Sequence, residues 1–112
     1  MYRRNDNLKF GEQMSKVLFT INYEIDSDKK EEYIRTIREL KNLIKAEGLE
    51  SYSVYEVKGK PNRFQEQYIF SSDEAFENFE DDTDERINIL ITKISGMTVD
   101  HSTKYTTSLE LL

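Results

Sequence analysis

The chain contains no cysteine and no tryptophan, and it has only one proline and four glycines among its 112 residues. The absence of cysteine excludes disulfide bonds, thiolate catalysis and cysteine-based zinc sites, and it permits a reducing compartment. No apolar run is long enough for a membrane span or for the core of a signal peptide. We therefore expect a soluble, cytoplasmic protein.

A shortage of basic residues excludes further classes. Sixteen lysine and arginine residues face 22 aspartate and glutamate residues, which gives a net charge of -6. This charge opposes non-specific attraction to nucleic acids and to anionic membrane surfaces, so we expect neither as a partner. The sequence also has no Walker loop and no GxGxxG, GxSxG or HExxH motif. Nucleotide binding and the common hydrolase classes therefore have no support.

The N-terminal segment, residues 1–14, is polar and has no sustained hydrophobic period. Two interpretations of it remain open. It is a flexible extension in front of a single domain over residues 15–112, or the natural protein starts at Met14, just before the first strand pattern. A peptide that contains Tyr2 to Gln13, found in protein from the native source, would exclude the second interpretation.

The rest of the chain alternates between strand and helix patterns. Residues 16–25 alternate apolar and polar side chains, as in a half-buried strand. Apolar residues recur at helical spacing within residues 26–48. Residues 50–71 predict an antiparallel hairpin, because two runs rich in aromatic and β-branched residues flank the turn sequence Gly-Lys-Pro-Asn. Residues 102–112 alternate again and predict a final strand.

Capping patterns predict where the first helix begins and ends. Ser27 or Asp28 can cap its start, Asp28 and Glu31 have the spacing of a capping box, and Gly48 suits a left-handed stop.

A second helical region begins at Ser71 or Ser72 and is interrupted by the acidic run at residues 80–85. Asp82 and Glu85 offer a fresh cap after the interruption, so we expect a kinked or split helix. The acidic run lacks the glycine turn and the ordered ligand spacing of a calcium loop. We therefore expect no metal site there.

The element order β, α, β, β, α, β predicts an α+β, ferredoxin-like fold, with a four-stranded antiparallel sheet and both helices on one face. The other face of the sheet would remain open. We expect it to carry Leu18, several aromatic side chains and part of the last strand. A domain of this size does not leave such a face in water, so we expect a homodimer through the open sheet face.

One segment carries a family resemblance. Along the chain it has a glutamate, a nearby aromatic residue, a serine, an acidic residue and then a Glu-Ala-Phe run at the start of a predicted helix. In this sequence they are Glu66, Tyr68, Ser72, Asp73 and residues 74–76. Together they resemble the dimeric α/β-barrel superfamily, which includes antibiotic-biosynthesis monooxygenases and haem-degrading monooxygenases. The resemblance covers residues 16–112. It implies two sheets packed face to face in a dimeric α/β barrel, with small molecules bound between each sheet and its helices or in a cleft at the barrel side.

The sequence departs from the residue patterns of the haem-degrading and the quinone-forming members of the superfamily. Haem-degrading members use an asparagine on the first strand, and a tryptophan and a histidine on the second helix. Asn22 can match the first, but Phe79 and Ile89 occupy the other two places, and isoleucine cannot hold haem iron. The quinone-forming monooxygenases often have a histidine where Phe79 lies. These monooxygenases need no cofactor when the substrate itself donates an electron to oxygen, so we expect no cofactor.

Two carboxylates and one imidazole are candidate catalytic groups. Glu66 and Glu56 each lie in the middle of a predicted strand and, if buried against Tyr68 or Tyr55, could act as an acid or a base. A structural hydrogen bond or a dimer contact is the alternative interpretation. His101 is the only histidine and lies in a polar loop, which makes it the weaker candidate.

A second set of residues is expected to line a ligand pocket or the dimer interface. Strand alternation places polar side chains of the first strand away from its apolar face. Aromatic residues on the strands suit a cavity for a planar molecule, and an ordinary β core is the alternative. The predicted ligand-binding residues are Asn22, Glu24, Tyr55, Tyr68 and Tyr105.

Three functions remain open from the sequence. The first is a homodimeric protein that binds a small organic molecule. The second is a cofactor-independent, monooxygenase-like enzyme for a small aromatic substrate, with a site shaped by Glu66, Tyr68 and Asn22, with or without His101. The third is a structural or regulatory partner protein that uses the same sheet face. Loss of turnover in a folded, dimeric Glu66→Gln variant would separate an enzyme from a binding protein.

Overall fold

The computed structural model describes residues 15–81 and 84–112, so the N-terminal segment and both interpretations of it lie outside the described residues. The elements follow one another as β1 (Val17–Glu24), the 3-10 turn η1 (Ser27–Lys29), α2 (Lys30–Leu43), β2 (Leu49–Glu56), β3 (Arg63–Phe70), α3 (Asp73–Asp81), α4 (Glu85–Met97) and β4 (Lys104–Leu109).

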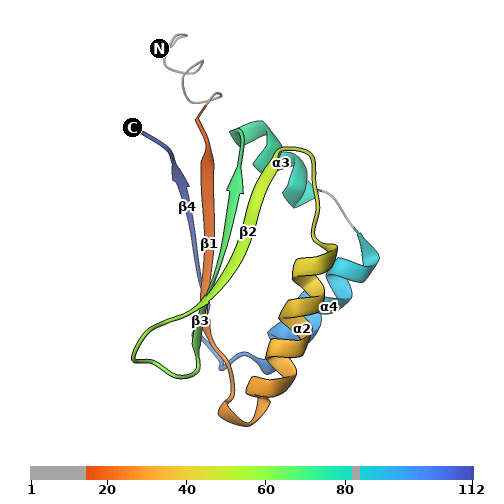
Figure 1. The fold of residues 1–112 in the computed structure, drawn as a ribbon, viewed down its shortest axis with the longest axis vertical. Helices are drawn as coiled ribbons and strands as arrows, with labels where there is room; N and C mark the ends of the chain where they lie inside the picture. Colours follow the sequence, from red (N-terminus) through yellow and green to blue (C-terminus); the bar gives the residue numbers. More distant parts are fainter. Residues whose placement is uncertain (1–14, 82–83) are drawn as a thin grey trace.

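The four strands form one antiparallel sheet in the order β2-β3-β1-β4. The helices lie together on one side of this sheet, with α2 next to α4 and α3 near the upper end of β3 (Figure 1). This arrangement confirms the predicted ferredoxin-like fold. The second helical region is two helices, as its acidic interruption indicated.

The hydrophobic core lies between the sheet and the helices. Strand alternation sends every second side chain of the sheet toward the helices, and α2 and α4 return apolar stripes of their own. Burying each large apolar side chain contributes about 1.5–3 kcal/mol. The largest fully buried side chains come from strands, the segment after β1 and α2: Tyr33, Phe70, Ile25, Leu40 and Val17.

The first helix begins and ends at different places from those predicted. The turn η1 precedes it and Lys29 is its N-cap, and among the described residues no side chain donates or accepts a capping hydrogen bond there. The prediction of a cap at Ser27 or Asp28 is therefore wrong. The helix stops because Ile44 adopts an extended conformation and buries its side chain. Gly48 has a positive φ of 83° but lies further on, in the turn before β2. It is therefore not the stop of the helix.

The caps of the other two helices are side chains. Ser72 accepts a backbone N–H from the first turn of α3, as predicted. The N-cap of α4 is Asp84, whose Oδ1 accepts the N–H groups of Arg86 at 2.9 Å and Ile87 at 3.3 Å. Its negative charge also suits the positive end of the helix dipole. The predicted cap, Asp82, lies outside the described residues.

The open face of the sheet is polar rather than aromatic, which corrects the sequence expectation. Tyr55 is the one aromatic side chain of the four strands on this face, and the others point toward the helix side. Alternation fixes only that neighbours point to opposite sides, and core packing chooses the side. The strand residues of the open face are Leu18, Thr20, Asn22, Glu24, Ser51, Ser53, Tyr55, Arg63, Gln65, Gln67, Ile69, Lys104, Thr106 and Ser108.

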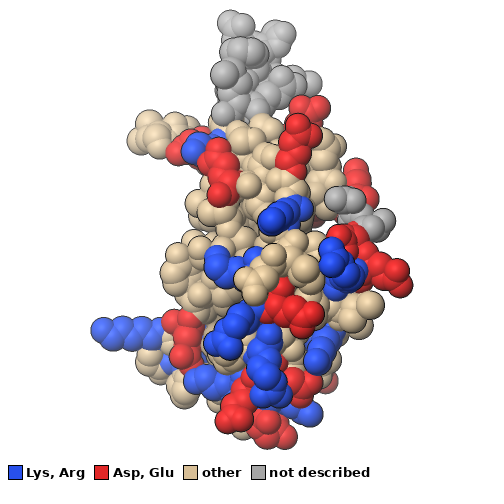
Figure 2. Space-filling model, turned by 45° about the vertical axis from the view of Figure 1, so that its right-hand side comes forward, with Lys and Arg blue, Asp and Glu red and all other residues tan. Residues whose placement is uncertain are grey.

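The helix side of the molecule carries charges of both signs. Lysine, arginine, aspartate and glutamate side chains crowd the lower half of the view in Figure 2. The visible surface therefore mixes the two signs instead of presenting the basic stripe that nucleic-acid binding uses. Among the described residues, no helix is long and apolar enough to cross a membrane.

Candidate functional site

A buried carboxylate, Glu66, lies on the helix side of the sheet. The residue is 4% exposed. Its Oε2 accepts the hydroxyl of Tyr23 at 2.6 Å, and its Oε1 accepts the hydroxyls of Tyr52 at 2.7 Å and Tyr68 at 3.1 Å. The hydroxyls of Tyr23 and Tyr33 lie 2.8 Å apart. We call these five residues the Glu66–tyrosine cluster.

The sheet register brings this cluster together from distant parts of the chain. Glu66 pairs with Ile21 on β1 and with Val54 on β2. Tyr23 and Tyr52 each lie one pleat away from those partners, so their side chains share the face of Glu66 and reach it diagonally. The fourth tyrosine comes from α2, which packs over the same face. A change of register by one residue would disperse the cluster.

Burial keeps the four phenols protonated. Desolvation raises the pKa of each tyrosine in the cluster, and the charge of Glu66 raises each pKa further. A protonated phenol can donate a hydrogen bond, and an ionised carboxylate can only accept. The cluster is therefore complementary in charge and in hydrogen bonding, and the buried carboxylate is satisfied.

A cleft opens near the cluster, among β1, α3 and α4, with a volume of about 260 Å³. Its lining combines aromatic and aliphatic side chains with polar ones. They are Phe19, Lys45, Phe79, Glu80, Asp84, Ile87, Asn88 and Ile91. This volume lies just below the usual range for ligand pockets, so the cleft suits only a small molecule with an apolar body and a polar group. We call it the helix–sheet cleft.

Aromatic rings connect the helix–sheet cleft to the cluster. The ring of Tyr68 lies 5.5 Å from that of Phe19 and 5.6 Å from that of Phe79, measured between centroids. Glu66 is not among the residues that line the cleft. A ligand in the cleft would therefore touch the phenylalanines, with Glu66 behind the ring of Tyr68.

A larger cleft of about 650 Å³ lies between the turn before β2 and α3. Its described lining includes the carboxylates of Glu47, Glu74 and Asp81, with Phe79 as the aromatic residue among them. This lining is more polar than that of the helix–sheet cleft, to which two phenylalanines contribute. We therefore regard the helix–sheet cleft as the candidate binding site.

The predicted ligand-binding residues do not meet in one pocket. Asn22 and Tyr55 lie on the open face, whereas Tyr68 belongs to the cluster on the opposite face. Tyr105 also points to the helix side, where its ring stacks on Phe19 with centroids 6.2 Å apart and the residue is 68% exposed. The structure thus divides these residues between the two faces of the sheet.

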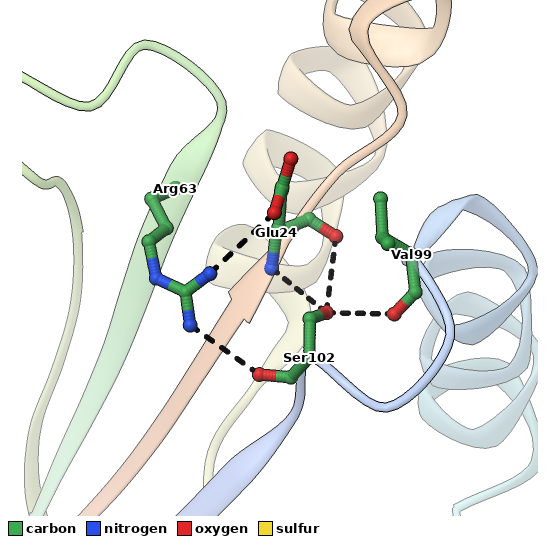
Figure 3. Close-up of polar contacts among 4 residues, drawn as sticks. All are labelled: Glu24, Arg63, Val99 and Ser102. Atoms are coloured by element: carbon green, nitrogen blue, oxygen red, sulfur yellow. Dashed lines mark hydrogen bonds and ion pairs between the residues drawn. The ribbon is translucent and has the colours of Figure 1, made fainter.

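Glu24 belongs to a network at one end of the sheet (Figure 3). Its Oε1 lies 3.6 Å from Nη1 of Arg63, whose Nη2 donates to the carbonyl of Ser102 at 3.5 Å. The Oγ of Ser102 accepts the N–H of Glu24 at 3.1 Å and donates to the carbonyl of Val99 at 2.7 Å. These contacts fasten the loop after α4 to the ends of β1 and β3.

The other catalytic candidates lie at the surface. His101 is exposed and has a positive φ of 65°, in the turn before β4. Glu56 is also exposed, and its Oε2 accepts a hydrogen bond from Nζ of Lys30 at 2.8 Å. In the part of the chain that the structure describes, no three histidine, cysteine, aspartate or glutamate residues form a group that could hold a metal ion.

The sequence predicted two members of the cluster, Glu66 and Tyr68, and missed the other three, Tyr23, Tyr33 and Tyr52. The useful signal is a mid-strand glutamate on the same face as several tyrosines. A buried phenol requires a hydrogen-bond partner, and a buried carboxylate requires donors.

Solved structures with this fold share little sequence with the chain. A Caulobacter crescentus protein that carries the name of an antibiotic biosynthesis monooxygenase has a TM-score of 0.77 at 7% identity, over 95% of this chain and 99% of its own. A variant of SnoaB, a cofactor-independent oxygenase from Streptomyces nogalater, has a TM-score of 0.70 at 9% identity, over 87% of this chain and 94% of its own. A conserved protein from Methanosarcina mazei has a TM-score of 0.75 at 14% identity, over 91% and 99%.

No protein-family model matches this chain, and no curated protein matches its sequence. At the identities found, the structural similarity shows the fold alone. The resemblance carried by the segment from Glu66 to Phe76 is confirmed at that level. The chain has the ferredoxin-like fold of antibiotic biosynthesis monooxygenase-type domains.

Proposed function

We propose that this protein binds a small, planar organic molecule in the helix–sheet cleft and acts as a homodimer. The observation that carries the proposal is the cleft itself, where Phe19 and Phe79 provide aromatic surface within a volume of about 260 Å³. Lys45 and Asn88 offer donors in the same lining, beside two carboxylates. A ring system with one or two oxygen substituents matches this combination of apolar and polar contacts.

Naphthol and naphthoquinone are planar ring systems with one and two oxygen substituents, and they serve as probes of the cleft. Ile91→Glu is expected to weaken the binding of either probe by about tenfold or more, which corresponds to about 1.4 kcal/mol. The new carboxylate would face the apolar part of the cleft and lose hydration when a ligand enters. Ile91 is 44% exposed, so the fold should tolerate the change. Isothermal titration calorimetry with the naphthol and naphthoquinone probes measures the dissociation constants.

The matched control is Ile89→Glu on the same helix. Ile89 is 59% exposed and does not line the helix–sheet cleft, so this variant should bind the probes like the natural sequence. Equal losses in the two variants, or unchanged affinity in Ile91→Glu, would contradict the placement of the ligand.

The open face of the sheet supports the proposed homodimer. Thr106, Thr20 and Gln67 are register partners across its middle, and all three are uncharged. The charged residues of the face, Glu24, Arg63 and Lys104, lie together at one end of the sheet, and the rest of the face is uncharged. Depletion of charged residues is typical of the core of a protein interface. Small side chains also let a second sheet approach closely.

Thr106→Arg is expected to convert the dimer into a monomer, because it places an arginine in the uncharged part of the open face, on the edge strand β4, where a partner sheet would bury it without a counter-charge. Light scattering after gel filtration should give a mass near 13.3 kDa in place of twice that value. Thr107→Arg is the control, since Thr107 is a neighbouring exposed threonine that points to the opposite face. A monomeric natural protein, or dissociation of both variants alike, would contradict this interface.

A second candidate function is oxygenation of the bound molecule without a cofactor. The specific observation that favours it is the fold shared with SnoaB, which is described as a cofactor-independent oxygenase. The balanced reaction on the probe is naphthol plus O₂ giving naphthoquinone plus water. Oxygen uptake and quinone absorbance, measured without added cofactor, distinguish the two functions. If the protein binds the probe but oxygen uptake does not exceed the protein-free rate, oxygenation of the probe is contradicted and the binding function is retained.

A further inference from the structure

Oxidisable side chains are concentrated in the Glu66–tyrosine cluster. The chain has no tryptophan and no cysteine, so its seven tyrosines are the side chains from which a single electron is most easily removed. Four of the seven belong to the cluster, and the rings of Tyr52 and Tyr68 lie 4.6 Å apart. The three tyrosines outside the cluster are Tyr2, Tyr55 and Tyr105.

Removal of an electron from a phenol needs a base, because the phenol radical cation is a strong acid and must lose its proton. Bulk water has little access here, since Tyr23 and Tyr68 are each 3% exposed and Tyr52 is 5% exposed. Glu66 supplies the base, with its two oxygens 2.6–3.1 Å from the three hydroxyls. One carboxylate thus serves three phenols, and it can take one proton at a time.

We propose that the Glu66–tyrosine cluster is a site of proton-coupled, one-electron oxidation. A peroxyl-type radical in the helix–sheet cleft takes one electron from Tyr68 and becomes a peroxide anion. The phenolic O–H bond of Tyr68 breaks, its proton forms a carboxylic O–H bond on Oε1 of Glu66, and a neutral tyrosyl radical remains. One electron from an ascorbate-type reductant and return of the proton from Glu66 restore the resting state.

The geometry gives the oxidising equivalent a route away from the cleft. The ring of Phe79 lines the cleft and lies 5.6 Å from Tyr68, and Tyr68 is followed by Tyr52 at 4.6 Å. Both hydroxyls share Oε1 of Glu66. The radical can therefore pass to Tyr52 while the proton on Glu66 returns to Tyr68 and is replaced by that of Tyr52. Removal of the oxidising equivalent protects a molecule bound in the cleft from oxidation. This chemistry does not require that the protein catalyse a reaction of the bound molecule.

The test uses the full chain with Tyr2, Tyr55 and Tyr105 changed to phenylalanine, so that every remaining tyrosine belongs to the cluster. Flash photolysis of a ruthenium tris-bipyridine complex with persulfate generates the oxidant, and transient absorption and electron paramagnetic resonance follow the tyrosyl radical. We expect a radical that forms more slowly in D₂O than in H₂O, because a proton moves with the electron. Glu66→Gln in the same background should lose most of the signal.

The outcomes that overturn the proposal are equally defined. They are no radical in the background protein, equal rates in the two solvents, or a radical of equal yield and lifetime in Glu66→Gln. Circular dichroism checks the fold of each variant. If Glu66→Gln does not fold, the combined change of Tyr23, Tyr52 and Tyr68 to phenylalanine replaces it, since these three phenols donate to Glu66; an unchanged signal in that variant overturns the proposal. Naphthol binding is measured separately, so failure of the proposed ligand site does not alter this result.

Discussion

Glu66→Ala is expected to lower the free energy of unfolding by about 3–5 kcal/mol, which is a large part of the total stability of a small domain. The change leaves the hydroxyls of Tyr23, Tyr52 and Tyr68 without their acceptor in a region that water does not reach. It also leaves a cavity between the sheet and the helices. Urea unfolding at a fixed protein concentration measures the loss, since dimerisation would make stability depend on concentration.

Glu56→Ala is the matched control. It removes another strand carboxylate, but the side chains of Glu56 and Lys30 are 42% and 39% exposed, so their ion pair contributes at most about 1 kcal/mol. We expect the two variants to differ by several times the experimental error. A loss for Glu66→Ala no larger than that for Glu56→Ala would show that the buried hydrogen bonds contribute little.

Gly48→Ala is expected to lower the free energy of unfolding by about 2–4 kcal/mol, from two separate causes. The residue has a φ of 83°, which a side chain disfavours. An added Cβ would also overlap the Cβ of Ala75 and lie 3.0 Å from Oγ of Ser71. Because the carbonyl of Gly48 accepts the N–H of Ser71 at 2.7 Å, the turn cannot move away freely. Urea unfolding again gives the change.

Gly59→Ala separates the two causes. Gly59 has nearly the same φ, 82°, but an added Cβ would have nothing within 4 Å. This variant therefore carries only the backbone strain, about 1–2 kcal/mol. The difference between the two variants measures the steric conflict of the turn with α3. Equal losses would mean that α3 shifts to accept the extra methyl group.

Local patterns predicted the elements because each depends on residues close in sequence. The alternation of residues 16–25 gave β1, and the Gly-Lys-Pro-Asn turn joined β2 to β3. The predicted cap and the predicted stop of the first helix were both wrong. Residues 27–29, which contain the predicted cap Asp28, form a 3-10 turn instead. The free energy of packing a whole helix against the sheet is larger than that of a single cap, about 1 kcal/mol, so packing decides where the helix begins.

The candidate site was predicted only in part. Glu66 and Tyr68 stood out as a mid-strand pair, but their side of the sheet could not be assigned from alternation alone. The helix–sheet cleft was not visible at all, since Phe19, Phe79 and Ile91 come from three different elements. Tyr105 and Tyr55 were grouped together, yet they lie on opposite faces.

The sequence by itself determined the order of the elements, the antiparallel hairpin, the break after α3 and the excess of negative charge. These properties follow from composition, spacing and turn chemistry, which act over a few residues. Only the tertiary structure decided that Glu66 faces the helices and gathers the hydroxyls of Tyr23, Tyr52 and Tyr68. That choice depends on strand register and on which face the helices bury, and both are set by contacts between segments far apart in the chain.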